Sequence, residues 1–257
     1  MTPPTAITSR DNPLLKRLRL LAQDSTAYRK QGQVWLEGDH LCRALLARGH
    51  RPDVAVFTDR YWPQAPQALR EAAPQVVTVP EALMAGLSGL ESAAGVGFVW
   101  ALPAAVPLAS DAPTVVLDRL QDAGNVGSIL RSAAAFGFTQ VAALKGTAAL
   151  WSPKVVRAGM GAHFGLRLVE GLSVADLDGL AVPLLATSSH QGEWLHQGEL
   201  PWPCAWLLGH EGQGVSAPLE AMAQRHVRIA QPGGEESLNV AAAAAICLHA
   251  SATRRSA

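Results

Sequence analysis

A glycine-rich loop follows an apolar run in the stretch Leu207-Leu-Gly-His-Glu-Gly-Gln-Gly214. Three of the six residues from Gly209 to Gly214 are glycines, and glycine allows positive φ and a close approach of the backbone to a ligand. A plain tight turn explains one such glycine, whereas three favour a loop that binds a flat group such as adenine. The stretch therefore predicts a ligand loop at the end of a buried strand.

A second motif, Asn125-Val-Gly-Ser-Ile-Leu-Arg131, lies earlier in the chain. Its apolar residues recur at helical spacing, which predicts a helix with Asn125 as its N-cap and Gly137 at its end. Arg131 follows Gly127 by one turn on the same helix face. Glycine has no side chain to obstruct whatever the guanidinium of Arg131 approaches.

A third motif runs from Ile229 to Ser237-Leu-Asn-Val240 near the C-terminus. It predicts a strand over residues 227–230 and a long helix that opens at Ser237 to Val240 and ends near Ala252. Ser237 or Asn239 is placed to cap that helix. The free backbone N–H groups at its start suit a carboxylate ligand.

Apolar runs bounded by turn residues recur through the chain and alternate with helical stretches. This pattern predicts an α/β protein whose C-terminal part contains buried parallel strands. In the C-terminal part the expected strands are Thr114–Leu117, Val141–Leu144, Pro183–Ala186, Ala205–Leu208 and Val227–Ala230. In the N-terminal part we expect helices at Pro13–Gln23 and His40–Arg48 and strands at Val34–Glu37, Val54–Thr58 and Val76–Val79.

A proline-rich stretch without periodicity follows Trp100 and predicts a linker. We accordingly expect an N-terminal domain over residues 1–100, a linker over 101–112 and a C-terminal domain over 113–257.

The 257-residue chain has a formal net charge of zero, which argues against a uniformly basic nucleic-acid-binding surface. Residues 1–51 nevertheless hold nine basic and four acidic side chains, which favours a local RNA-facing surface. The three cysteines lack metal or disulfide spacing and are expected to be buried thiols: Cys42, Cys204 and Cys247. Because of this spacing no metal site is predicted. Neither a signal segment nor a membrane helix is expected, so we predict a soluble, cytoplasmic protein.

Together the three motifs resemble the signatures of the SpoU (TrmH) family of RNA 2′-O-ribose methyltransferases in the SPOUT superfamily. The likeness covers roughly Pro113 to Ala252. The matching residues are Asn125, Gly127, Arg131, Gly209, Glu211, Gly214, Ser237, Leu238, Asn239 and Val240. A weaker likeness, around Asn12 to Leu45, is to the small ribosomal-protein-like substrate-binding domain that precedes the catalytic domain in many members.

The resemblance implies a trefoil-knotted parallel sheet with flanking helices, S-adenosylmethionine as cofactor, RNA as substrate and a homodimer. It implies a catalytic set of Arg131, Asn125, Glu211, Ser237 and Asn239. It implies a cofactor pocket of Leu208, Gly209, Gly214, Ile229 and Leu238. The usual Ile-Pro-Met of the third motif is Ile229-Ala230-Gln231 in this chain, which changes the pocket wall.

Arg131 is implied to act on the 2′-hydroxyl, either as a base or by binding the adjacent phosphate. In the family this arginine reaches the cofactor site of the other protomer. Arginine normally keeps its proton in proteins, so a base would need unusual help, whereas bidentate phosphate binding suits a guanidinium.

The separate N-terminal domain favours ribosomal RNA over transfer RNA as the substrate, because such a domain can recognise folded RNA. The alternatives are a tRNA 2′-O-methyltransferase and an RNA-binding module without catalysis. A hydrolase using Ser237 and His210 is disfavoured because the chain lacks a Gly-x-Ser-x-Gly motif. A Rossmann enzyme is disfavoured because Gly-x-Gly-x-x-Gly does not follow the first strand of the C-terminal part.

Overall fold

A computed structural model describes residues 3–89, 92–188, 191–233 and 237–254. The chain divides into two compact units. The first unit contains Met1–Ala104 and Trp151–Phe164, and the second contains Ala105–Leu150 and Gly165–Ala257. The short segment from Trp151 thus belongs to the first unit, although it lies within the C-terminal half of the sequence.

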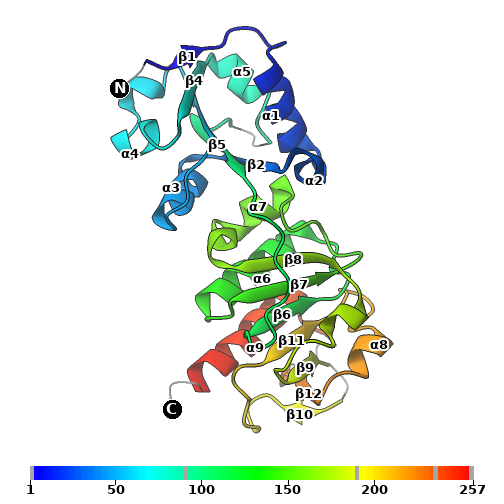
Figure 1. Ribbon diagram of the computed structural model, residues 1–257. Coiled ribbons are helices and arrows are strands. Elements are labelled where there is room, and N and C mark those ends of the chain that lie inside the picture. The colour runs from blue at the N-terminus through cyan, green and yellow to red at the C-terminus, as the bar shows by residue number, and fades with distance from the viewer. Residues whose placement is uncertain (1–2, 90–91, 189–190, 234–236, 255–257) are drawn as a thin grey trace. The chain divides into compact units, whose positions relative to one another are not determined.

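The first unit is an α/β structure around a five-stranded sheet with the order β1-β4-β3-β5-β2 (Figure 1). Its strands are β1 (Thr5–Ala6), β2 (Gln33–Glu37), β3 (Val54–Thr58), β4 (Gln75–Val79) and β5 (Val96–Ala101). Its helices are α1 (Pro13–Gln23), α2 (Ala27–Gln31), α3 (Asp39–Ala47), α4 (Gln67–Arg70), α5 (Glu81–Ala85) and α7 (Pro153–Gly159). Two 3-10 helices, η1 (Trp62–Gln64) and η2 (Ala162–Gly165), complete the segments that belong to or border this unit.

Helix α1 has the predicted bounds, Pro13–Gln23, because its local sequence specifies them. The Asn12 side chain accepts a hydrogen bond from the backbone N–H of Leu14 at 2.9 Å, and Pro13 occupies the first turn. Leu15 and Leu18 form part of the buried face against the sheet.

The second unit contains a seven-stranded sheet with the order β10-β12-β9-β11-β6-β7-β8. Its neighbouring strands all pair in parallel, which confirms the predicted parallel sheet. The strands are β6 (Thr114–Leu117), β7 (Gln140–Leu144), β8 (Arg167–Leu172), β9 (Leu184–Thr187), β10 (Glu193–Trp194), β11 (Ala205–Leu208) and β12 (Arg225–Arg228). The helices are α6 (Ala123–Ala135), α8 (Ala217–Glu220) and α9 (Val240–Arg254), with a 3-10 helix η3 (Val174–Leu177).

Two sequence predictions in this unit were wrong in position. Strand β12 covers Arg225–Arg228 rather than 227–230, because its register places Arg225 opposite Leu185 of β9 and leaves Ala230 exposed. Helix α6 begins earlier than predicted, and its N-cap is Asp122, whose carboxylate accepts from the backbone N–H of Asn125 at 2.7 Å. Asn125 therefore lies in the first turn of the helix, and its side chain is available for other contacts.

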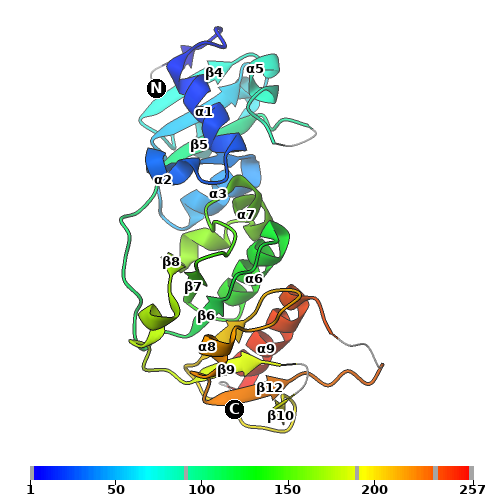
Figure 2. The same ribbon diagram turned by 90° about the vertical axis from the view of Figure 1, so that its right-hand side faces the viewer.

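Helices α6 and α9 pack against each other on one face of the parallel sheet (Figure 2). Gly137, with φ of +78°, follows α6 and ends it as predicted. Asn239 caps α9, because its side-chain oxygen accepts from the backbone N–H groups of Ala241 and Ala242 at 2.9 and 3.2 Å. Helix α6 follows β6, and Asn239 before α9 donates to Asn125 in the first turn of α6, so the two helices start near each other beside the carboxyl edge of the sheet.

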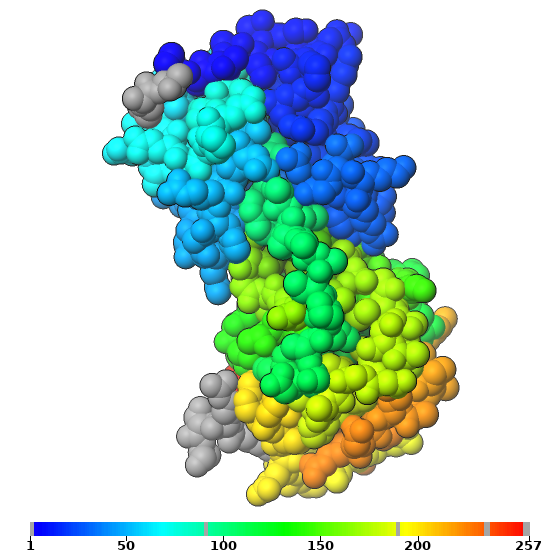
Figure 3. All heavy atoms as spheres, viewed as in Figure 1, coloured from blue at the N-terminus to red at the C-terminus, as the bar shows by residue number. Residues whose placement is uncertain are grey.

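The residues expected to form a linker lie on the surface of the second unit from Ala105 onward, and Figure 3 shows this segment in green. The Gln140 side chain bonds both backbone groups of Ala109, accepting at 2.8 Å and donating at 3.1 Å. The backbone carbonyl of Ser110 accepts from the backbone N–H of Ala181 at 2.8 Å. Polar contacts therefore hold this segment on the second unit, and the segment also connects the two units.

The three cysteines are free and buried, as predicted. Burial raises the pKa of the Cys204 and Cys247 thiols to about 12. Within the described part of the chain, no helix has both the length and the apolar content to cross a bilayer.

Helix α9 is attached to the sheet by a buried polar contact that can be tested. The fully buried Trp206 of β11 donates its indole N–H to the Ser251 hydroxyl at 2.9 Å. We expect Ser251→Ala to reduce the free energy of unfolding by about 1–3 kcal/mol, because the indole N–H is left buried and unpaired. Urea denaturation measures this change.

Thr253→Ala is the matched control on the same helix. The Thr253 hydroxyl donates to the backbone carbonyl of His249 at 3.0 Å, but this residue is exposed. We expect it to change stability by at most about 0.5 kcal/mol. Equal losses for the two variants would contradict the role of the Trp206 contact.

Candidate functional site

All three motifs emerge at the carboxyl edge of the parallel sheet. Strands β6 and β11 are neighbours, and the backbone N–H of Asp118 donates to the carbonyl of Leu208 at 2.9 Å where both strands end. Strand β12, which leads into the third motif, pairs with β9 on the other side of β11. Ligands of open parallel sheets bind at this edge, so the topology brings the motifs to one place.

The Asn125 side chain connects the three motifs by hydrogen bonds. Its amide nitrogen donates to a carboxylate oxygen of Glu211 in the second motif at 3.3 Å. Its amide oxygen accepts from the side chain of Asn239 in the third motif at 3.0 Å. Three of the five predicted catalytic residues therefore form one chain of contacts.

The contacts also fix the orientation of both amide groups. The Asn239 oxygen accepts from backbone N–H groups at the start of α9, so its NH₂ group must face Asn125. The Asn125 oxygen accepts that donor, and its NH₂ group faces Glu211, whose carboxylate only accepts. Reversing either amide would place donors against donors, so the network specifies one arrangement.

Glu211 is held as a carboxylate in this network. Partial burial raises its pKa, but hydrogen bonds from its own backbone N–H, the Asn125 amide and the backbone of Asp122 and Gln121 outweigh this effect. The pKa of Glu211 therefore lies below its ordinary value, and the group stays ionised at neutral pH. The contacts of Glu211 are lost only as the pH falls through this lowered pKa.

The second motif forms a tight loop stabilised by its own backbone. His210 and Gly214 exchange two backbone hydrogen bonds, at 3.0 and 2.9 Å, and Gly214 has a φ of +69°. A Cβ on Gly209 would lie 2.0 Å from the backbone of Gly214 and Val215, so only glycine permits this crossing. The His210 ring accepts from the backbone N–H of Gly212 at 3.0 Å.

The remaining predicted site residues lie on α6, at the ends of β11 and β12, in the second-motif loop and before α9. Arg131 is exposed on α6, and its side chain makes no hydrogen bond or ion pair with the residues that the structure describes. Ser237 and Leu238 are also exposed, and the exposed fraction of Leu238 is 39%. Ile229 is half-buried directly after β12, whereas the side chain of Leu208 is fully buried beneath the loop. Residues 234–236 of the third motif lie outside the described residues.

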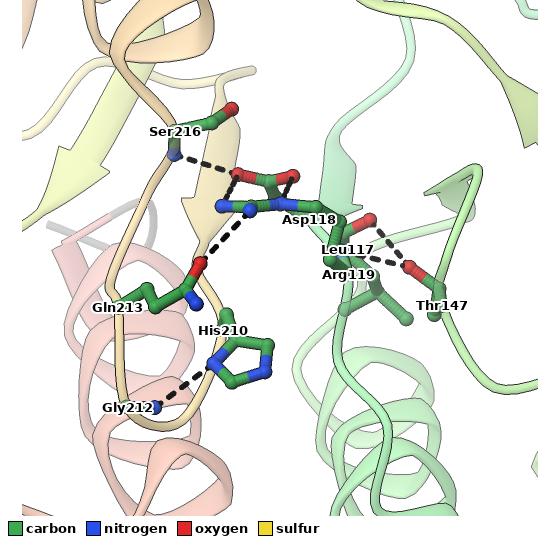
Figure 4. A network of polar contacts seen from close by, with 8 residues as sticks. All are labelled: Leu117, Asp118, Arg119, Thr147, His210, Gly212, Gln213 and Ser216. Atoms are coloured by element: carbon green, nitrogen blue, oxygen red, sulfur yellow. Dashed lines mark hydrogen bonds and ion pairs between the residues drawn. The ribbon is translucent and has the colours of Figure 1, made fainter.

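A second group of polar residues, which was not predicted from the sequence, lies beside the loop (Figure 4). Asp118 follows β6, and its buried carboxylate accepts from Arg119 Nε at 2.9 Å and from the backbone N–H of Ser216 at 2.7 Å. Arg119 also donates to the Gln213 side chain at 3.1 Å. An acidic residue directly after a buried strand was the signal that could have revealed this group.

The other chemical alternatives find no matching geometry among the described residues. For the hydrolase alternative, no hydrogen bond joins His210 and Ser237 in the described part of the chain. Among the described residues, no group of three or more His, Cys, Asp or Glu side chains could hold a metal.

The family model of the SpoU rRNA Methylase family matches residues 112–249. A Synechocystis protein described as an uncharacterized tRNA/rRNA methyltransferase is 33% identical over 95% of this chain and 92% of its own length. A crystal structure of an RNA 2′-O ribose methyltransferase shares 29% identity and a TM-score of 0.81, covering 98% of this chain and 100% of that chain. The AdoMet-bound rRNA methyltransferase of Sinorhizobium meliloti shares 25% identity and a TM-score of 0.84, covering 98% of each chain.

The close approach at Gly209 predicts a sharp difference between two glycine variants. We expect Gly209→Ala to displace the loop and weaken S-adenosylmethionine binding by at least about tenfold, or about 1.4 kcal/mol. Isothermal titration calorimetry measures this affinity.

Gly212→Ala is the control in the same loop, because the nearest atoms to its added Cβ would lie 3.9 Å away, in the His210 ring. We expect its affinity to stay within about twofold of the unmodified protein. Full binding by the Gly209 variant would show that the loop crossing is not needed for the cofactor.

Proposed function

The chain belongs to the SpoU rRNA Methylase family, and we propose that it transfers a methyl group from S-adenosylmethionine to a ribose 2′-hydroxyl of ribosomal RNA. The observation that carries this proposal is the hydrogen-bonded chain through Asn125, which joins all three motifs at one edge of the sheet. It is supported by relatives named as RNA methyltransferases, one of which was solved with AdoMet bound.

The cofactor would bind at the second-motif loop and the start of α9. The chemistry of this place fits the cofactor: Gly209 permits the tight loop, the exposed Gly214 carries no side chain that would cover it, and Leu238 presents an apolar side chain with 39% exposure that suits an adenine. The half-buried Ile229, directly after β12, would supply a second apolar wall, and the fully buried Leu208 ends the strand that leads into the loop. When bound, S-adenosylmethionine supplies an electrophilic methyl group.

Arg131 and the Asn125 network would then act on the RNA. Arg131 is exposed and charged, and it has five N–H donors in a planar group, which suits binding of the phosphate beside the acceptor ribose. Because positioning alone can supply much of the acceleration of a group transfer, fixing the ribose against the cofactor is a sufficient task for this residue. Glu211, Ser237 and Asn239 would orient the ribose or the groups that touch it.

We propose a homodimer in which Arg131 serves the cofactor site of the partner protomer. The apolar side chain of Ile246 is 41% exposed on α9, beside the alanines of the same helix, which supports a subunit contact on this face. A protein that sediments as a monomer in analytical ultracentrifugation and is active in RNA methylation would contradict this assembly.

The first unit would bind the RNA substrate. Seven basic residues of the first 51 are exposed on it: Arg10, Lys16, Arg29, Lys30, Arg43, Arg48 and Arg51. Such side chains can contact the phosphates of a folded RNA. The trefoil knot stays a prediction that follows from the family, and the cytoplasmic location stays a prediction from the sequence.

The reaction is tested by incubating the protein with methyl-labelled S-adenosylmethionine and unmodified ribosomal or transfer RNA. We expect a labelled 2′-O-methyl nucleoside from ribosomal RNA after complete digestion. Arg131→Ala should lose about a hundredfold or more in rate, because the phosphate beside the acceptor ribose is no longer held and the ribose loses its position against the cofactor. Its cofactor affinity should be unchanged, and Arg131→Lys, which keeps the charge, should retain part of the rate.

Other products would revise the proposal in defined ways. Label in transfer RNA alone would change the substrate, and a base-methylated nucleoside would overturn the reaction. Cofactor binding without any methylation, in either RNA pool, would indicate an RNA-binding protein that has lost catalysis.

A further inference from the structure

Arg119 has an unusual backbone conformation at the end of β6. Its φ is +58°, a left-handed value that residues other than glycine rarely adopt. The backbone N–H of Arg119 donates to the Thr147 hydroxyl at 3.1 Å, and that hydroxyl donates to the carbonyl of Leu117 at 3.0 Å. The surrounding contacts therefore hold a conformation that the residue itself disfavours, and such positions are often functional.

The buried carboxylate of Asp118 orients the Arg119 side chain. Asp118 has an exposed side-chain fraction of 2%, and Arg119 one of 35%. Arg119 Nε donates to one carboxylate oxygen at 2.9 Å, while the backbone N–H of Ser216 donates to the other at 2.7 Å. A charge this deeply buried requires such partners, so the guanidinium has little freedom to turn away.

The outer end of the guanidinium reaches the second-motif loop. Arg119 Nη1 donates to the side-chain oxygen of Gln213 at 3.1 Å, and Figure 4 shows this contact closing the gap between β6 and the loop. Gln213 lies between two glycines, and a Cβ on Gly214 would find no atom within 4 Å. The tip of the loop is thus loosely packed, and the Gln213 side chain fastens it.

We propose that Arg119 is a positioning residue for S-adenosylmethionine binding, which it serves by holding Gln213 and the backbone of residues 212–214 in place. This inference rests on the proposed function, because that loop is where the cofactor would bind. Lysine cannot replace it fully, because a single ammonium lacks the planar donors that bond Asp118 and Gln213 together.

Gln213→Ala is the principal test, because it leaves the pair of Asp118 and Arg119 intact. We expect cofactor affinity, measured by calorimetry, to fall about tenfold, the size expected for one hydrogen bond to a charged group. Without cofactor, hydrogen exchange of the loop amides over residues 210–214 should become faster by about tenfold. The maximal methylation rate at saturating cofactor should stay unchanged.

Arg119→Ala and the double variant Arg119→Ala/Gln213→Ala complete a double-mutant cycle. If the two residues act only through each other, the double variant binds the cofactor about as weakly as Arg119→Ala alone. Arg167→Ala is the control, since Arg167 is an exposed arginine of the same unit that bonds the carbonyl of Pro107 at 3.0 Å. It should leave both affinity and loop exchange unchanged.

Three results would overturn the inference, and they differ from a failure of the proposed function. Unchanged affinity in Gln213→Ala, unchanged loop exchange, or additive losses in the double variant would each show that Arg119 does not position the loop. An unmodified protein that binds no S-adenosylmethionine would instead overturn the proposed function, and this inference with it.

Discussion

One asparagine amide holds together the parts on which the site depends. Asn125 donates to Glu211 and accepts from Asn239, so its two ends join the ligand loop to the start of α9. The arrangement requires an ionised Glu211, and the hydrogen bonds around that carboxylate lower its pKa. The packing of α6 against α9 and the position of the loop are therefore coupled through a single side chain.

The loop itself is constrained from both sides by the end of β6 and the helix after it. Glu211 is held by Asn125 and the backbone of Asp122, and Gln213 is held by Arg119. Gly209 permits the close crossing that these contacts need. The exposed side chain of Arg131 on α6 takes no part in these contacts.

Sequence patterns predict much of this arrangement, and the predictions that were wrong or missing have physical reasons. Strands such as Thr114–Leu117 and Ala205–Leu208 were predicted with their bounds, because a strand buried on both faces is a continuous apolar run. Strand β8 was not predicted, because it lies at the sheet edge and no residue of Arg167–Leu172 is fully buried. The N-cap of α6 was assigned to Asn125 because asparagine and Asp122 are equally good caps in sequence, and only the backbone conformation distinguishes them.

Hydrogen exchange with and without S-adenosylmethionine tests whether the second and third motifs, which Asn125 of the first motif joins, form the cofactor site. We expect slower exchange at the second-motif loop, residues 209–214, and at the start of α9, residues 237–243. Peptides from Met1–Ala104 of the first unit should be unchanged. Protection confined to the first unit, or to the opposite edge of the parallel sheet, would contradict the account.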